Sequence, residues 1–140
     1  MPKLIDAFLF FQELDLLEIR LNYLYEHVDR FVILEAAQTF SGNPKPLVFK
    51  ENIHRFEKYL DKITYYTVED VHQDYESVQA WLKTQKSEAY ISILRIMDGH
   101  THYSRKHLHW VLDTYHREML HAPLNECASN DDLVMFSDLD

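Results

Sequence analysis

Apolar residues recur along this chain with two different spacings, which predict strands and helices in alternation. Residues 4–11 are almost all apolar, which is typical of a strand covered on both faces in a parallel sheet. From Leu14 to Val28 the apolar positions recur every three or four residues with acids between them, which predicts an amphipathic helix. Residues 31–34 (FVIL) form a second short apolar run. A strand, a helix and a strand within about 35 residues make a βαβ unit, so we expect an α/β fold.

Turn-forming residues are concentrated at residues 39–46, after this unit. The pattern beyond them predicts, in chain order, a short helix over residues 53–60, a strand over 63–68, helices over 81–86 and 89–97, a longer helix over 103–121 ended by Pro123, and a buried strand over 133–136 (LVMF).

Composition and charge exclude several classes of protein. The hydrophobic fraction of 46% is enough for a packed core, so a disordered chain is excluded. Fourteen Lys and Arg against 23 Asp and Glu give a formal charge of −9, and we therefore expect no nucleic-acid partner. No run approaches the ~20 apolar residues of a membrane span, and no signal peptide is evident, so we expect no membrane span and a cytoplasmic location. The lone Cys127 fits a reducing compartment.

Two acids, Asp138 and Asp140, directly follow the last predicted strand. In open α/β sheets, ligands bind at the carboxyl ends of the strands. Carboxylate oxygens are hard ligands that suit Mg²⁺ or Mn²⁺. Acidic pairs also cap helices and lie in solvated turns, so the triplet alone leaves both interpretations open.

Four separated stretches of the chain, in order, resemble glycosyltransferase family 17. They are FLFFQELDLLEIRLNYLYEHVDRFVILEA (residues 8–36), QTFSGNPKPLVF (38–49), Trp-x-x-Asp-x-Tyr-His-Arg (110–117) and SDLD (137–140). The departures from the family's pattern are Gln12, Asp113 and His116, where Asn, Glu and Gln are usual.

The resemblance implies a GT-A fold, which is a Rossmann-like, mostly parallel sheet flanked by helices. In such folds an Asp-x-Asp holds a divalent cation, Mn²⁺ or Mg²⁺, on the diphosphate of a UDP-sugar. By position, Asp140 is the expected direct metal ligand, and Asp138 is expected to reach the ribose or the water shell of the metal.

The resemblance further implies inverting transfer of N-acetylglucosamine from UDP-N-acetylglucosamine to a mannosyl glycan acceptor. One family member adds the bisecting sugar of N-glycans, and its animal forms are anchored in the Golgi membrane. Residues 1–140 are then expected to form the N-terminal, nucleotide-sugar-binding part of a GT-A domain that stops after the Asp-x-Asp strand. We expect the general base to lie beyond residue 140 and assign no catalytic residue.

Two other functions stay open. The first is a non-catalytic or truncated fragment that binds nucleotide without transferring sugar. The second is a metal-dependent nucleotidyltransferase, which also uses paired acids on such a sheet. The glycine-rich phosphate loop of that class has no counterpart here, since the only glycines are Gly42 and Gly99.

Residues near the ends of the first two strands are candidates for binding the donor. Glu13 is placed to accept a hydrogen bond from uracil or ribose, or to stabilise the start of a helix. Glu35 ends the second strand, where acids of dinucleotide folds bind a ribose hydroxyl, although a solvated strand end explains it equally. In the loop that follows, we include Thr39 as well as Lys45, whose flanking prolines would direct its ammonium toward a phosphate.

Arg117 is the candidate on the long predicted helix. Its guanidinium offers two parallel hydrogen bonds to a diphosphate, or else pairs with Asp113 one turn earlier. Histidines at positions 100, 102, 107 and 109 form a dense patch. With no cysteine among them, we expect an exposed patch rather than a metal site.

Overall fold

The structure is a computed structural model that describes residues 2–100 and 104–139. Its centre is a sheet in which all strands are parallel, in the order β3-β2-β1-β4. The strands are β1 (Leu4–Phe10), β2 (Arg30–Ala36), β3 (Ile63–Val68) and β4 (Leu133–Phe136). This confirms the predicted α/β class with its Rossmann-like arrangement.

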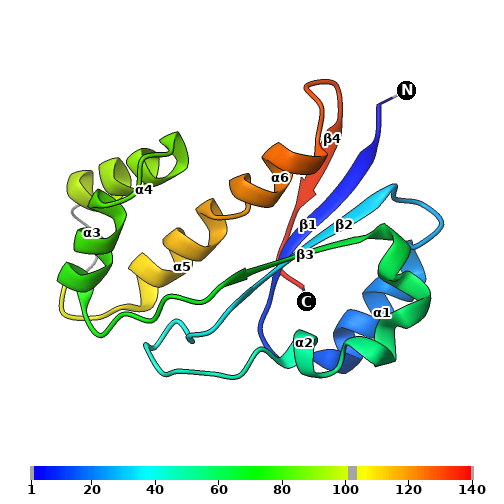
Figure 1. Ribbon diagram of the computed structural model, residues 1–140, viewed down its shortest axis with the longest axis horizontal. Helices are drawn as coiled ribbons and strands as arrows, with labels where there is room; N and C mark the ends of the chain where they lie inside the picture. Colours follow the sequence, from blue (N-terminus) through cyan, green and yellow to red (C-terminus); the bar gives the residue numbers. More distant parts are fainter. Residues whose placement is uncertain (1, 101–103, 140) are drawn as a thin grey trace.

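Helices lie on both sides of the sheet (Figure 1). On one side are α1 (Leu14–Leu24), α2 (Val48–Glu51) and the 3₁₀ helix η1 (Ile53–Lys62). On the other are α3 (Tyr75–Lys83), α4 (Glu88–Gly99), α5 (His109–Glu118) and α6 (His121–Cys127). The segment after β4 runs past the carboxyl end of β1, where Leu139 packs against the core between β1 and α1 (Figure 1).

Each face of the sheet has its own hydrophobic core, because side chains alternate between the faces along a strand. Phe8 and Phe10 of β1 pack with Leu17 and Leu21 of α1 on one face. Ile5 of β1 belongs to the core on the opposite face. Burial on both faces explains the almost unbroken apolar run of β1.

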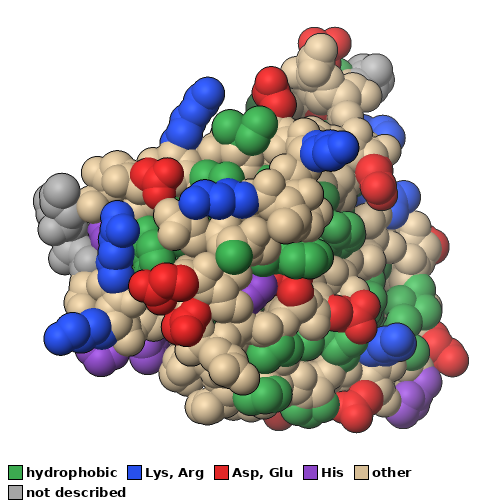
Figure 2. Space-filling model, turned by 60° about the vertical axis from the view of Figure 1, so that its left-hand side comes forward, with side chains coloured by type: hydrophobic (Ala, Val, Ile, Leu, Met, Phe, Trp, Pro, Cys, Tyr) green, Lys and Arg blue, Asp and Glu red, His purple; other side chains and the backbone are tan. Residues whose placement is uncertain are grey.

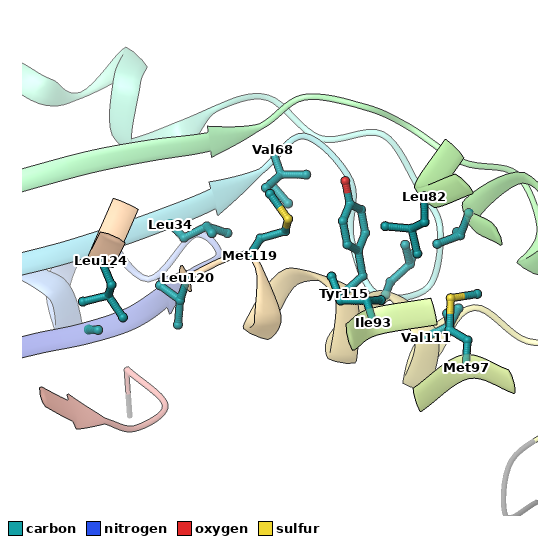
Figure 3. Close-up of a cluster of buried hydrophobic side chains, with 14 of the residues drawn as sticks. Leu34, Val68, Leu82, Ile93, Met97, Val111, Tyr115, Met119, Leu120 and Leu124 are labelled. Carbon is teal, nitrogen blue, oxygen red and sulfur yellow. The ribbon is translucent and has the colours of Figure 1, made fainter. Parts of the chain in front are cut away.

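The second core extends from the sheet to the outlying helices. Figure 3 shows it running from β2 and β3, along α5 and α6, to α3 and α4. The residues labelled there are Leu34, Val68, Leu82, Ile93, Met97, Val111, Tyr115, Met119, Leu120 and Leu124. Helix α5 therefore packs between the sheet and the α3–α4 pair, with its side chains contacting both.

The expectation that the last strand is buried is wrong. β4 pairs only with β1, at the edge of the sheet. Leu133 is 67% exposed and Phe136 60%, while Val134 packs against the second core. Helices cover β1 and β2 more fully than they cover β4. An apolar sequence pattern does not itself show which strands the helices will cover.

The predicted helices near the C-terminus also differ from those observed. The long helix expected over residues 103–121 is two helices, α5 and α6, separated at Met119 and Leu120. Its expected start at residue 103 lies outside the described residues. Pro123 falls in the first turn of α6 instead of ending a helix, and a proline costs little there because that turn's N–H groups have no partner within the helix.

The described helices include none with both the length and the apolarity needed to cross a membrane. On the face in Figure 2, Lys and Arg side chains are scattered among Asp and Glu side chains. This mixture follows from the acid-rich composition, and no extended basic surface is visible on that face.

Leu21 tests the packing of α1 on the sheet. It is fully buried, so Leu21→Ala should lower the free energy of unfolding by about 2–5 kcal/mol through lost contacts and a cavity. Ile19 on the same helix is 64% exposed, so Ile19→Ala should change it by no more than about 0.5 kcal/mol. Urea unfolding measures both variants, and equal losses would contradict the described orientation of α1.

Candidate functional site

A pocket of about 470 Å³ opens at the carboxyl ends of β1 and β2. Its walls come from those strand ends, the loop after β2, helix α5 and the residues that follow β4. Five of the residues predicted from the sequence line it: Glu13, Thr39, Lys45, Arg117 and Asp138.

The connectivity of the sheet explains why the pocket forms there. From β1 the chain adds β2 and then β3 on one side, and it returns to place β4 on the other side of β1. Connections that leave a strand end in opposite directions open a crevice, which is the usual ligand site of open α/β sheets. The pocket lies at this point of reversal.

Segment 137–139, which follows β4, is held by Arg20 of α1. Through Nη1 the guanidinium donates to the carbonyl oxygens of Asp138 at 2.7 Å and Leu139 at 3.2 Å. Through Nη2 it donates to Ser137 Oγ at 2.6 Å. The backbone that carries Asp138 is thereby fixed against α1.

Arg20 is itself fixed by Asp6, a fully buried residue inside β1. The carboxylate accepts bonds from Nε at 2.8 Å and from Nη2 at 2.6 Å, and the guanidinium lies over the Phe8 ring. Neither residue was predicted from the sequence, because Asp6 stands in an apolar run and Arg20 on the polar side of a helix. The available signal was Asp6, since a carboxylate in a strand covered on both faces needs a partner.

Arg117 makes the predicted ion pair with Asp113 and a second one with Asp138, while its contact with a diphosphate stays a prediction. Its Nε donates to Asp113 Oδ1 at 2.5 Å, one turn earlier on α5. Its Nη2 lies 2.9 Å from Asp138 Oδ1, across the mouth of the pocket. The Asp138 carboxylate is 65% exposed, so it remains accessible to a ligand despite this ion pair.

Glu35 lies outside the pocket lining and is fully buried. Its carboxylate accepts hydrogen bonds from Lys45 Nζ at 2.7 Å, Tyr65 Oη at 2.7 Å, and the backbone N–H groups of Val48 and Phe49. Burial and the bond to Glu35 raise the pKa of the Tyr65 hydroxyl. These partners join β2, β3 and the start of α2, an arrangement that does not favour the predicted contact with a ribose.

Lys45 lines the pocket, yet its ammonium is bound within the protein. Besides Glu35, Nζ donates to the carbonyl oxygens of Ala36 at 3.1 Å and Pro46 at 2.9 Å. An ammonium has three N–H donors, and these three bonds use all of them. In this arrangement Lys45 fixes the loop after β2 and leaves no donor for a phosphate.

The polar residues of that loop form one wall of the pocket. Thr39 Oγ1 accepts a hydrogen bond from the Asn43 N–H at 3.0 Å and lies 2.9 Å from Ser41 Oγ. Gly42 has a φ of 97°, which a side chain rarely adopts. Glu13, also in the lining, is half-buried, precedes α1 and makes no capping hydrogen bond with its side chain.

A hydrogen-bond network that the sequence analysis did not predict extends from the pocket. Gln38, in the lining, accepts from the His72 N–H and donates to the His72 carbonyl. Asp70 lies 2.6 Å from His72 Nε2 and accepts from Tyr115 Oη at 2.8 Å. Burial alone would raise the pKa of Asp70, but these hydrogen bonds hold it below its usual range. The network ties the loop after β3 to α5.

His116 is buried next to this network, and its ring packs at a tilt against Phe40 of the pocket wall and against Tyr115. Within residues 2–100 and 104–139, its Nε2 has no hydrogen-bond partner. Burial lowers its pKa to about 4, with the nearby charges of Asp70, His72 and Lys45 as smaller influences. His116 is therefore neutral at pH 7 and packs behind Phe40 of the pocket wall.

The predicted metal ligands are only partly described. Asp138 lines the pocket, whereas Asp140 lies outside the described residues. Of the four patch histidines, His102 also lies outside them and His107 is exposed. His109 lines the pocket, and the His100 ring packs at a tilt against Trp110. No group of three His, Cys, Asp or Glu with the geometry of metal ligands occurs among the residues that the structure describes.

The low pKa of His116 predicts a loss of stability in acid. The unfolded chain takes up a proton near pH 6.5 and the folded chain only near pH 4, so stability should fall as the pH drops through that window. The loss should reach about 3 kcal/mol, and His116→Phe should remove most of it. Urea unfolding from pH 7 to 4 measures the effect. The exposed His27 supplies the control variant His27→Phe, and equal acid sensitivity in all three proteins would contradict the assignment.

The chain matches a known protein family. The family described as Glycosyltransferase family 17 matches residues 1–100. The matched part includes β1, β2, β3 and the loop after β2, whereas Arg117 and Asp138 follow it. No curated protein and no solved structure matches the chain.

Proposed function

Because this chain belongs to glycosyltransferase family 17, we propose that its pocket binds the nucleotide of UDP-N-acetylglucosamine. The proposal includes a divalent cation, Mn²⁺ or Mg²⁺, and inverting transfer of the sugar to a mannosyl residue of a glycan. The observation that carries it is that Glu13, Thr39, Arg117 and Asp138, from four separate segments, meet in one pocket at the carboxyl ends of the strands.

Charge supports the need for a cation. The chain has a formal charge of −9, and the Asp138 carboxylate stands at the mouth of the pocket. A diphosphate next to this carboxylate would be repelled unless a cation lay between them. Mg²⁺ is usually held by one or two carboxylates together with substrate phosphates. One described carboxylate at the mouth fits that requirement, and we propose Asp140 as the second.

Once bound, the cation would offset the negative charge that grows on the departing diphosphate. Asp138 would hold it, with Asp140 as the proposed second ligand. Arg117 now pairs with Asp138, and its guanidinium would turn to a phosphate oxygen when the cation occupies the carboxylate. The bond from Arg117 to Asp113 would keep the guanidinium near the mouth during this exchange.

The rest of the lining suits a nucleoside. Phe11, Phe40 and Leu139 supply apolar surface for the uracil ring. Glu13 has a carboxylate suited to the donors of uracil or ribose, and Thr39 offers a hydroxyl. We assign no general base, because the lining acids Glu13 and Asp138 have other proposed roles.

Calorimetry with UDP tests the proposal. UDP should bind more tightly with Mn²⁺ than with a chelator, by about 5- to 150-fold, the usual range of coupling between two ligands. Asp138→Asn should remove most of this gain, because the amide carries no charge to hold the cation. Asp140→Ala should do the same if Asp140 is the second ligand.

Asp131→Asn is the matched control, since Asp131 is exposed and precedes β4 at the end away from the pocket. This variant should keep the wild-type gain. Equal UDP affinity with Mn²⁺ and with chelator in the wild type would contradict the cation bridge. Loss of the gain in Asp131→Asn alone would place the cation elsewhere.

A further inference from the structure

The guanidinium of Arg20 is saturated by contacts from two parts of the fold. It has five N–H donors. Two bind the buried carboxylate of Asp6, two bind the carbonyl oxygens of Asp138 and Leu139, and one binds Ser137 Oγ. The side chain therefore connects the interior of β1 to segment 137–139.

Segment 137–139 needs this connection because it lies beyond the sheet. The pairing of β1 with β4 ends at Ala7 and Phe136. Past that point, the described ties of the segment are the Arg20 bonds, the packing of Leu139 and the ion pair between Arg117 and Asp138.

Arg20 and Arg117 bind different atoms of segment 137–139. Arg117 binds the Asp138 carboxylate, the group a cation would take, so this contact must give way when the ligand binds. Arg20 binds backbone carbonyls and Ser137 Oγ, and its other donors are held by Asp6. The hydrogen bonds of Arg20 to the segment can therefore remain while the Asp138 carboxylate exchanges Arg117 for a cation.

We propose that Arg20 is a positioning residue that keeps the Asp138 carboxylate at the pocket mouth, with Asp6 as its anchor. The importance of this position for ligand binding rests on the proposed function. The ordering of segment 137–139 by Arg20 does not depend on that function, so the ordering and the effect on ligand binding can be tested separately. Lysine cannot replace Arg20, because an ammonium offers a point charge and no planar set of five donors.

Variants must avoid leaving Asp6 as an unpaired buried charge, which would itself destabilise the fold. Arg20→Lys keeps the positive charge and loses the planar geometry. The double variant Asp6→Leu with Arg20→Met replaces the whole pair with apolar side chains, a change that proteins often tolerate. Arg55→Met is the matched control. Arg55 also forms ion pairs with α1, through Asp15 and Glu18, but these partners do not belong to segment 137–139.

The first measurement uses NMR relaxation of the free protein, without nucleotide or metal. In the wild type the backbone order parameters of Asp138 and Leu139 should be near the rigid value of about 0.85, and in the double variant they should fall below about 0.6. Arg20→Lys should lie between, and Arg55→Met should match the wild type. Unchanged order parameters in the folded double variant would overturn the inference.

The second measurement is the gain in UDP affinity on adding Mn²⁺. In Arg20→Lys most of this gain should be lost, with metal-free UDP affinity within about twofold of the wild type. A purely structural arginine would lower stability and leave that ratio unchanged, which would also overturn the inference. A wild type without any gain would contradict the proposed function, and the relaxation result would still decide what Arg20 holds.

Discussion

The ion pair between the buried carboxylate of Asp6 and the guanidinium of Arg20 determines how the end of β4 meets the pocket. A carboxylate inside a parallel sheet is costly unless a cation pairs with it. Arg20 meets that need from α1 and uses its remaining donors on segment 137–139. A requirement of the core thus also sets the position of Asp138.

A similar principle operates on the other wall of the pocket. Glu35 is buried at the end of β2, and Lys45 reaches it from the loop that carries Thr39. There, too, a buried acid recruits a cation whose spare donors bind backbone carbonyls. The pocket is therefore held by two internal ion pairs, and the charged groups facing its mouth, Arg117 and Asp138, contact each other and remain partly exposed.

How much could be predicted from the sequence depended on the range of the interactions involved. The strands β1 to β3 and helix α1 follow from the local spacing of apolar residues. The rule that ligands bind at the carboxyl ends of the strands of an open sheet indicated the edge where residues from distant segments line one pocket. The exposure of β4 and the break between α5 and α6 depend on which surfaces pack together, which periodicity does not encode. Glu35, Lys45 and Asp138 pair with residues elsewhere in the chain, and each of them could equally bind a ligand. Residue type alone therefore could not predict which partner each one has.

The central claim is that the pocket at the carboxyl ends of β1 and β2 is a nucleotide-diphosphate site whose cation is bound by Asp138. Crystals grown with UDP and Mn²⁺, measured at the manganese absorption edge, test it most directly. The account predicts an anomalous peak within about 2.0–2.6 Å of an Asp138 carboxylate oxygen, shared with the diphosphate. Bound UDP with no such peak, or a peak away from segment 137–139, would contradict it.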